Sequence, residues 1–195
     1  MSVSVASLRG EALMAALPDL ARLRIAVFRA YPYLYEGSEE YEAGYVRAYA
    51  ESPGAVVVAA RDGDRIVGMA TAAPMEDHAA EFAEPFRVRG YDLKEILYLG
   101  ESVLLPEYRG QGVGHAFFDA REAHGRALGR RVFAFCAVVR PADHPARPEG
   151  YRPLDAFWRK RGYEPVEGLV GEFSWKEVGA SETSRHPMQF WLRRE

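Results

Sequence analysis

The chain has 195 residues, of which 48% are hydrophobic and 27% are charged, and its formal net charge is −3. This length and composition predict one globular domain over residues 1–195, large enough to bury a core. The slightly acidic balance gives no general attraction to nucleic acid or to an anionic membrane, so neither is expected as a partner. The single cysteine, Cys136, excludes an intramolecular disulfide, and no stretch approaches membrane-spanning length. We therefore expect a cytoplasmic protein.

The first half of the chain predicts helices followed by a hairpin. Its expected elements are a strand over 3–5, a helix over 19–30, a helix over about 39–51 and two strands within 55–74. Ser38 stands where it can cap the second helix, before an acidic first turn. Asp62 and Gly63 supply the turn that joins the two strands. Residues 76–94 are polar and partly helical in pattern, and Pro85 is expected to break that pattern.

The second half of the chain predicts a β-α-β unit. Its expected elements are a strand over 96–105, a helix ending at Gly129, a strand over 132–139, a short helix at about 154–161 and late strands near 171–178 and 187–193. The helix places four side chains on one face, namely Phe117, Ala120, Ala123 and Ala127, and it pairs Glu122 with Arg126. The apolar run 132–139 does not alternate, which is typical of a strand covered on both faces. This order of elements indicates parallel pairing within the sheet.

A glycine-rich loop, LLPEYRGQGVG (104–114), joins that strand to that helix. Glycines let the main chain approach a ligand, and the free N–H groups at a helix start favour an anion. A dinucleotide-binding loop would need a third glycine where His115 stands, and a nucleotide-triphosphate loop would need a lysine that is missing here. The pattern that fits is R-x-x-G-x-G, formed by Arg109, Gly112 and Gly114. The alternative is a tight turn that binds nothing.

This pattern, within LLPEYRGQGVGHAFF, resembles the pyrophosphate-binding motif of the GNAT superfamily of N-acetyltransferases, including a Pro-Glu-Tyr lead-in at 106–108. The segment DAFWRKRGYEP (155–165) is similar to the late helix of that family, and the order of elements matches from about residue 3 to 192. The resemblance implies an α/β fold with a GNAT-like mixed central sheet, flanked by helices, in which two parallel strands splay apart. It also implies acetyl-CoA as the cofactor, lying in that opening.

The resemblance places acetyl-CoA along the strand end and the loop. Backbone N–H groups from Gln111 to Gly114 and the helix dipole would hold the pyrophosphate, and Arg109 would help to form the loop. The splayed strand end would offer unpaired backbone groups to the pantetheine arm and the thioester. The predicted cofactor-binding residues are Val103, Leu104, Leu105, Arg109, Gly110, Gln111, Gly112, Val113, Gly114 and His115.

Acetyl transfer to an amine requires a group that removes a proton from an ammonium, whose pKa is ordinarily about 10.4. Glu101 is the predicted base, because it interrupts the apolar run ILYLGESVLL just before the loop. Its neighbour Ser102 could bind water in a proton relay, and Glu95 is the reserve. The alternative for Glu101 is a carboxylate that pairs with an arginine.

A general acid is harder to assign. The family often has a tyrosine near the CoA sulfur, at the position of Trp158, and an indole cannot give up its proton. Tyr151 is the predicted replacement. Tyr163, a water, or departure of the thiolate without an acid are the alternatives. Cys136, within an apolar run, is expected to be an inert core thiol rather than a nucleophile.

The segment YPYLYEG (31–37) lies in the region that walls the acceptor site in this family. Its predicted substrate-binding residues are Tyr31, Tyr33 and Glu36, because acids and aromatic faces both attract a cationic amine. The alternative is that these tyrosines only close the core between two helices. The expected acceptor is a small polyamine-like, amino-sugar or amino-acid molecule rather than a protein tail.

The sequence therefore predicts an N-acetyltransferase that transfers acetyl directly from acetyl-CoA to a small-molecule amine in a ternary complex. A non-catalytic acyl-CoA-binding regulatory module is the alternative, which Trp158 favours. No metal site is expected, because the histidines show no ligand spacing. A homodimer is left open, and so is an acyl group longer than acetyl.

Overall fold

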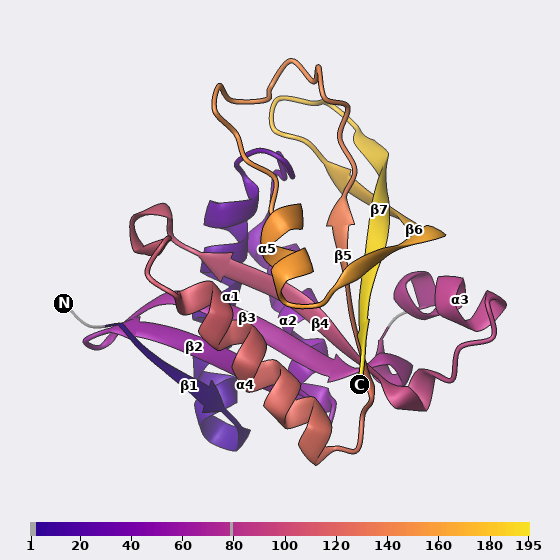
Figure 1. Cartoon of the computed structure of the whole chain (residues 1–195). Helices are drawn as coiled ribbons and strands as arrows, with labels where there is room; N and C mark the ends of the chain where they lie inside the picture. Colours follow the sequence, from indigo (N-terminus) through magenta and orange to yellow (C-terminus); the bar gives the residue numbers. More distant parts are fainter. Residues whose placement is uncertain (1–2, 79) are drawn as a thin grey trace.

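The computed structural model describes residues 3–78 and 80–195. The chain forms a seven-stranded sheet, in the order β1-β2-β3-β4-β5-β7-β6, with helices on both faces (Figure 1). The elements are β1 (Ser4–Leu8), α1 (Gly10–Phe28), α2 (Glu39–Glu51), β2 (Val56–Asp62), β3 (Arg65–Pro74), α3 (Ala80–Val88), β4 (Ile96–Leu104), α4 (Val113–Ala127), β5 (Val132–Val138), α5 (Asp155–Lys160), β6 (Glu164–Lys176) and β7 (Thr183–Arg194). The expected α/β fold with a mixed, helix-flanked sheet is confirmed.

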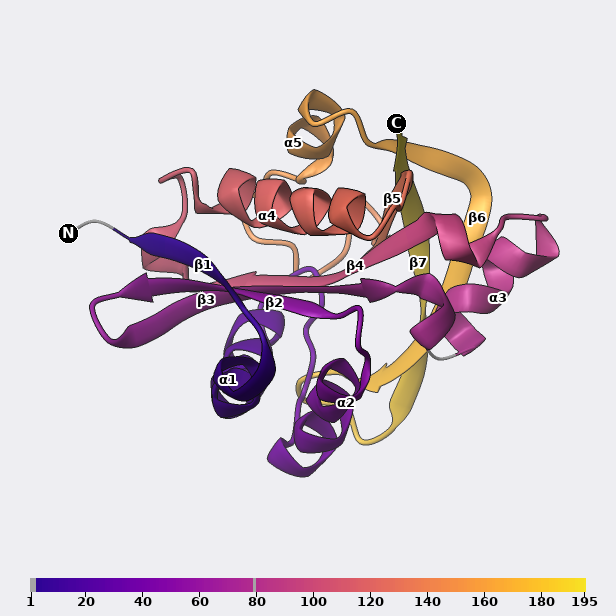
Figure 2. The ribbon, with the colours of Figure 1, turned by 90° about the horizontal axis from the view of Figure 1, so that it is seen from below.

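Helices α1 and α2 cover one face of the sheet, and α4 covers the other (Figure 2). The side chains of β2 alternate between these two layers. Val57 packs with Leu20 and Leu23 of α1, whereas Val58 packs with Phe117 of α4. A strand buried on both faces needs apolar residues at every position, which explains the run AVVVAA. In the described part of the chain, no helix is long and apolar enough to cross a membrane.

Strands β4 and β5 run parallel but pair over only three residues each, Ile96–Tyr98 with Val132–Ala134. Beyond these pairs β4 stays on β3 and β5 stays on β7, so the two strands separate. The register of β4 on β3 shifts at the same place, where Thr71 faces both Gly100 and Glu101. Such a bulge bends a strand and increases its twist. The expected splay of two parallel strands is confirmed.

The first helix begins earlier than expected, and Pro85 does not break the helical segment in which it stands. The first helix begins at Gly10 rather than at residue 19 and contains Pro18, and α3 contains Pro85 instead of being broken by it. A proline removes one helical hydrogen bond, but packing of an amphipathic face supplies most helix stability in proteins. Leu17 and Leu20 are buried on either side of the first proline, and Phe86 follows the second.

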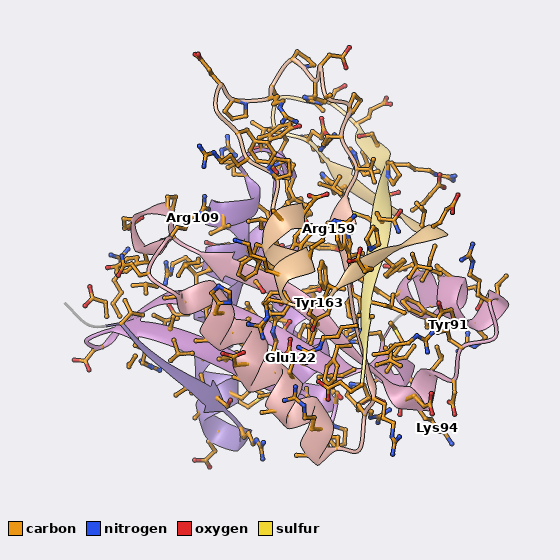
Figure 3. All side chains as sticks on the ribbon, viewed as in Figure 1. Tyr91, Lys94, Arg109, Glu122, Arg159 and Tyr163 are labelled. Atoms are coloured by element: carbon orange, nitrogen blue, oxygen red, sulfur yellow. The ribbon has the colours of Figure 1, made fainter. Side chains whose placement is uncertain are left out.

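The buried face of α4 differs from the predicted one. Phe117 is buried as expected, but Ala123 and Ala127 are exposed. A charged residue, Glu122, is buried on this face instead, because its carboxylate has partners. It accepts a hydrogen bond from Tyr163 at 3.0 Å (Figure 3) and forms an ion pair with Arg161 at 3.0 Å. The predicted ion pair of Glu122 with Arg126 is present at 3.7 Å.

The remaining predicted elements are close to the observed ones. The helix at 39–51 is confirmed, and the Ser38 hydroxyl accepts the N–H of Tyr41 at 3.3 Å. The hairpin of β2 and β3 is confirmed as well, with Gly63 in the left-handed region at φ 58°. Strands β6 and β7 are longer than expected, because they form one long antiparallel pair.

Gly125 lies where α4 rests on β4 and β5. A Cβ added there would stand 2.6 Å from the Phe133 ring and 2.9 Å from the Leu97 side chain. Gly125→Ala is therefore expected to lower the free energy of unfolding by about 1–3 kcal/mol, as overpacked cores do. Gly44→Ala is the matched control, since a Cβ on the exposed face of α2 would meet nothing within 4 Å. It should stabilise by about 0.5–1 kcal/mol through helix propensity. Urea unfolding checks both, and equal shifts would contradict this account of the packing.

Candidate functional site

The loop between β4 and α4 leaves free space beside its glycines. Gly110 and Gly112 adopt left-handed backbone conformations, with φ 75° and φ 83°, which glycine tolerates best. A Cβ added at either position would have no atom within 4 Å. At Gly114 the only such neighbour is the tip of the Phe157 ring, at 3.6 Å. The main chain is therefore open to a ligand on this side.

Helix α4 begins directly at this open space. Its first helical hydrogen bond runs from the Ala116 N–H to the Gly112 carbonyl, at 3.2 Å. The N–H groups of Val113, Gly114 and His115 precede that bond and have no helical carbonyl to donate to. Together with the positive end of the helix dipole, such groups attract an anion. The loop can thus hold a phosphate group by main-chain atoms alone.

Arg109 folds back over the start of the loop (Figure 3). Its guanidinium donates through Nε and through one terminal nitrogen to the Leu104 carbonyl, both at 3.4 Å. Gln111 closes the next turn by donating from its side chain to the Glu107 carbonyl at 3.2 Å. The Arg109 side chain is exposed to solvent beside the anion site, and its hydrogen bonds to the Leu104 carbonyl fix the course of the loop.

The other predicted cofactor residues lie at the end of β4 and at the start of α4. Val103 is buried in the layer beneath α1, and the Leu105 N–H donates to the Val67 carbonyl at 3.1 Å. Beyond Tyr98, one edge of β4 no longer pairs with β5 and faces the gap between the two strands. Val103 and Leu104 belong to this unpaired part of β4. The His115 ring packs against Phe157, with 4.8 Å between centroids. Contacts of these residues with a cofactor remain predictions.

Glu101 is held by a buried hydrogen-bond network on the α1–α2 face. Its Oε1 accepts from the Thr71 hydroxyl at 3.0 Å, and its Oε2 accepts from Arg24 at 2.8 Å and from Tyr45 at 3.0 Å. Arg24 also donates to Glu42, at 2.5 Å. We call Arg24, Glu42 and Glu101 the buried ion cluster. Two carboxylates and one guanidinium leave it with one excess negative charge.

This network is the arginine-paired arrangement foreseen as the alternative to a catalytic base. A carboxylate offers about four acceptor positions, and three are taken here. Ser102 lies on the opposite face of the sheet, where its hydroxyl accepts from Arg121 at 2.9 Å. Adjacent strand residues point to opposite faces, so the geometry does not support the expected relay from Glu101 through Ser102.

The structure does not bring the aromatic candidates for a general acid to this network. Tyr151 lies in the loop before α5, with its ring edge against Tyr31 at 4.7 Å. Trp158 packs between Phe135 and Trp191, each at 5.0 Å, as a packing residue does. Burial and the neighbouring Glu122 raise the pKa of Tyr163 well above its ordinary value, and its hydroxyl already donates to Glu122 at 3.0 Å, so this phenol is a weak candidate for the acid.

A cavity of about 290 Å³ lies on the α1–α2 face, and we call it the aromatic pocket. Six tyrosines line it, namely Tyr33, Tyr35, Tyr41, Tyr45, Tyr49 and Tyr98. Its charged and titratable lining residues also include Arg24, Asp77, His78, Glu81 and Glu101. Gly100 of β4 and Cys136 of β5 line the same cavity, and both lie just beyond the last paired residues of their strands. The aromatic pocket therefore meets the gap between β4 and β5.

Only one of the three predicted substrate residues lines this pocket. Tyr33 does, whereas Tyr31 and Glu36 are not part of the lining. The Tyr31 ring packs against Tyr151, and Glu36 pairs with Arg29 at 3.2 Å at the surface. Tyr35 of the same segment does line the pocket, whereas the Glu36 carboxylate accepts the Gly179 N–H at 3.4 Å.

Sequence reasoning missed the tyrosines of α2 and the residues after β3. Tyr41, Tyr45 and Tyr49 recur every four residues, so they share one face of α2, and this spacing was the available signal. Asp77 and His78 gave no such signal, because their position depends on how the chain leaves β3. In residues 3–78 and 80–195, no three His, Cys, Asp or Glu side chains are grouped to hold a metal ion.

Cys136 is half-buried: it packs against the core cluster that contains Tyr98 and Phe190, and it also lines the aromatic pocket. Its sulfur is 3.0 Å from the Tyr98 hydroxyl. Burial raises the pKa of the Cys136 thiol to about 12, so the thiolate is scarce at neutral pH. Because the thiolate is the nucleophilic form, this thiol is not suited to carry an acetyl group.

The sequence model of the Acetyltransferase (GNAT) family matches residues 17–163 of the chain. This protein belongs to the GNAT family of acetyltransferases. GNAT enzymes use acetyl-CoA, which is therefore the cofactor of this protein. No curated protein sequence matches the chain.

Solved GNAT structures share the fold at low sequence identity. The protein yncA from Salmonella typhimurium, solved with its cofactor acetyl-CoA, superposes with a TM-score of 0.61 at 11% identity, covering 100% of this chain and 94% of the other. A phosphinothricin acetyltransferase from Sinorhizobium meliloti, in complex with acetyl-CoA, gives 0.61 at 19% identity, with 100% and 89% covered. A ribosomal-protein-alanine N-acetyltransferase from Brucella melitensis gives 0.60 at 15% identity, with 98% and 99% covered. Their different acceptors leave the substrate of this GNAT protein to be argued from its own residues.

The residues of this GNAT loop fit the pyrophosphate of acetyl-CoA. The space beside Gly110 and Gly112 is open, and the N–H groups of Val113 to His115 are available to an anion. When bound, acetyl-CoA supplies an acetyl group activated as a thioester. Gly100 and Cys136 stand beside the gap between β4 and β5 and also line the aromatic pocket.

Gly112→Ala is expected to weaken acetyl-CoA binding about tenfold or more, because it places a Cβ in the open space and strains a left-handed residue. Arg109→Ala should weaken binding as well, since the loop loses its contacts to Leu104. Gly129→Ala is the matched control, because Gly129 has a similar φ of 75° at the far end of α4. Calorimetric titration with acetyl-CoA measures all three. Equal affinities for Gly112→Ala and Gly129→Ala would contradict the role of the loop.

Proposed function

We propose that this GNAT enzyme transfers the acetyl group of acetyl-CoA to the amine of a small cationic molecule, with both bound at once. The observation that carries the proposal is the aromatic pocket, which meets the β4–β5 gap from the face opposite α4. The acceptor and the cofactor can therefore approach the gap from different sides. A protonated Cys136 thiol gives no covalent route, which favours direct transfer.

The charges of the pocket favour a cationic acceptor. Asp77, Glu81 and Glu101 bring three carboxylates to its lining, against the single guanidinium of Arg24. That guanidinium already serves Glu42 and Glu101 in the buried ion cluster. Tyrosine faces attract an ammonium group in addition. A cavity of about 290 Å³ is suited to a small molecule and not to a protein surface.

The pocket residues constrain how protons move. Glu101 remains the expected proton acceptor, because it belongs to β4 at the gap and retains capacity for one more donor. Burial and Glu101 raise the pKa of Tyr49, and burial raises that of Tyr98, so both phenols keep their protons at neutral pH. These phenols are weaker acids than a thiol, so the proton lost by the new amide nitrogen is the one that neutralises the departing thiolate.

The alternative is a non-catalytic protein that binds acyl-CoA and regulates a partner. Trp158 favours it, because this side chain stands where the family often has its acid and is packed against Phe135 and Trp191. The buried ion cluster and the acidic pocket favour the enzyme, since a module that only binds acyl-CoA needs no site for a cation.

A thiol-release assay with a panel of amines separates the two functions. The panel contains spermidine, glucosamine, lysine and a peptide with a free amino terminus, after acetyl-CoA binding has been established by titration. We expect turnover with at least one small cationic amine and little with the peptide. Binding of acetyl-CoA without release of thiol above hydrolysis on any amine would favour the regulatory module.

Glu101→Gln is expected to raise the KM for the amine about tenfold and to lower turnover most strongly at low pH, because one carboxylate at the gap is lost. The affinity for acetyl-CoA should stay near normal. Glu36→Gln is the matched control, since that carboxylate lies outside the aromatic pocket. Initial rates across pH 6–9 measure both. An unchanged KM and pH profile for Glu101→Gln would move the proton-accepting role to Glu95 or to water.

A further inference from the structure

The ring of His78 forms part of the wall of the aromatic pocket and has no role in the transfer described above. His78 follows the 3₁₀ turn Met75–Asp77 at the end of β3. Its ring lies 4.8 Å from the ring of Tyr98 and 5.6 Å from that of Phe82 of α3, between centroids. Tyr98 is the last residue of β4 that pairs with β5. The imidazole therefore stands beside the start of the gap.

One nitrogen of this ring is buried without a partner. His78 Nε2 has no hydrogen bond to any residue that the structure describes. The ring is bonded to the Ala73 backbone, and since Nε2 is free, that bond belongs to Nδ1. A neutral imidazole whose Nδ1 carries the hydrogen presents Nε2 as an acceptor. Unpaired buried nitrogens are costly and are commonly completed by water or by a ligand.

The surroundings keep this imidazole neutral. Burial lowers the pKa of His78 to about 4, although Asp77 and the Ala73 bond oppose the change. The titratable groups around the ring are Tyr49 of α2, Tyr98 of β4, and the carboxyl groups of Asp77 and Glu81. A cationic acceptor would therefore meet no positive charge on this wall.

Resting on the proposed function, we propose that His78 Nε2 accepts a hydrogen bond from the acceptor amine and fixes where that amine stands beside the β4–β5 gap. An ammonium group has three donors and no acceptor, so a bare imidazole nitrogen complements it. After the ammonium has lost one proton, a remaining N–H stays on Nε2 and the lone pair is left free for the acetyl carbon. The C–N bond then forms as the C–S bond breaks, and the second proton goes to the thiolate.

His78 is a binding contact in this scheme and not the base. Glu101 is the proton acceptor of the proposed function, and the neutral imidazole of His78 only has to accept a hydrogen bond. Loss of Nε2 should therefore appear mainly in the affinity for the amine. A base would instead alter the pH dependence of kcat/KM.

The test compares His78→Phe, which keeps an aromatic ring, with His78→Gln, whose amide oxygen can stand near the position of Nε2. With spermidine and with the fastest acceptor of the panel, His78→Phe should raise the amine KM about tenfold and leave acetyl-CoA affinity unchanged. His78→Gln should stay within about threefold of wild type and keep its pH profile. His144→Phe is the matched control, because His144 lies outside the aromatic pocket. Because His78→Phe loses the bond of Nδ1 to Ala73, its Tm is measured as well, so that a loss of stability is distinguished from a loss of amine binding.

An unchanged amine KM in His78→Phe would overturn the proposal, and so would loss of a pH inflection in His78→Gln, which would make His78 the base. If His78→Phe does not fold, the comparison of His78→Gln with His78→Leu decides in the same way. If the wild type binds acetyl-CoA but acetylates no amine, the proposed function fails. The inference about His78 is then tested by calorimetric titration of spermidine into the CoA-saturated protein. Weaker binding of spermidine by His78→Phe than by the wild type would support the inference. Equal binding, or none by the wild type, would overturn it.

Discussion

The separation of β4 from β5 is the constraint on which the site depends. Three pairs of residues hold the strands together at one end, and beyond Tyr98 and Ala134 each strand keeps only its antiparallel partner. Backbone groups of a buried strand need partners, so a gap inside a sheet is stable only where something else satisfies them. The bulge at Gly100 and Glu101 bends β4 away at the same place. Helices cover both faces of the sheet (Figure 2), and Gly100 and Cys136 beside the gap also line the aromatic pocket.

The buried ion cluster connects helices α1 and α2 to β4 beside this gap. Arg24 comes from α1, Glu42 from α2 and Glu101 from β4, so one guanidinium joins both helices to the strand that bends. Removing one partner of a buried pair commonly costs about 3–5 kcal/mol, because an uncompensated charge is left behind. The Tyr45 ring lies 3.9 Å from the same guanidinium and its hydroxyl donates to Glu101. The residues that shape the pocket are thus the residues that give it negative charge.

Two features of the site followed from local sequence and one did not. The loop pattern of Arg109, Gly112 and Gly114 predicted an anion site, because left-handed glycines and free helix N–H groups arise within a few residues. The glutamate that interrupts β4 was also evident. Its partner Arg24 was not, because 77 residues separate the two and the arginine sits in an otherwise ordinary helix. The geometry also does not support the expected relay from Glu101 to Ser102, because adjacent residues of a strand point to opposite faces of the sheet.

The sequence by itself determined the β-α-β unit, the glycine loop and the family resemblance, since these depend on residues that are neighbours in the chain. Only the tertiary structure decided the composition of the aromatic pocket. Its lining comes from α1 and α2, the turn after β3, and strands β4 to β7, so no local pattern describes it. Tyr33 joined that lining whereas Tyr31 and Glu36 stayed outside, although all three stand within six residues. Packing of distant elements decides which side of such a segment is enclosed, because burial of apolar surface is a property of the whole fold and not of a segment.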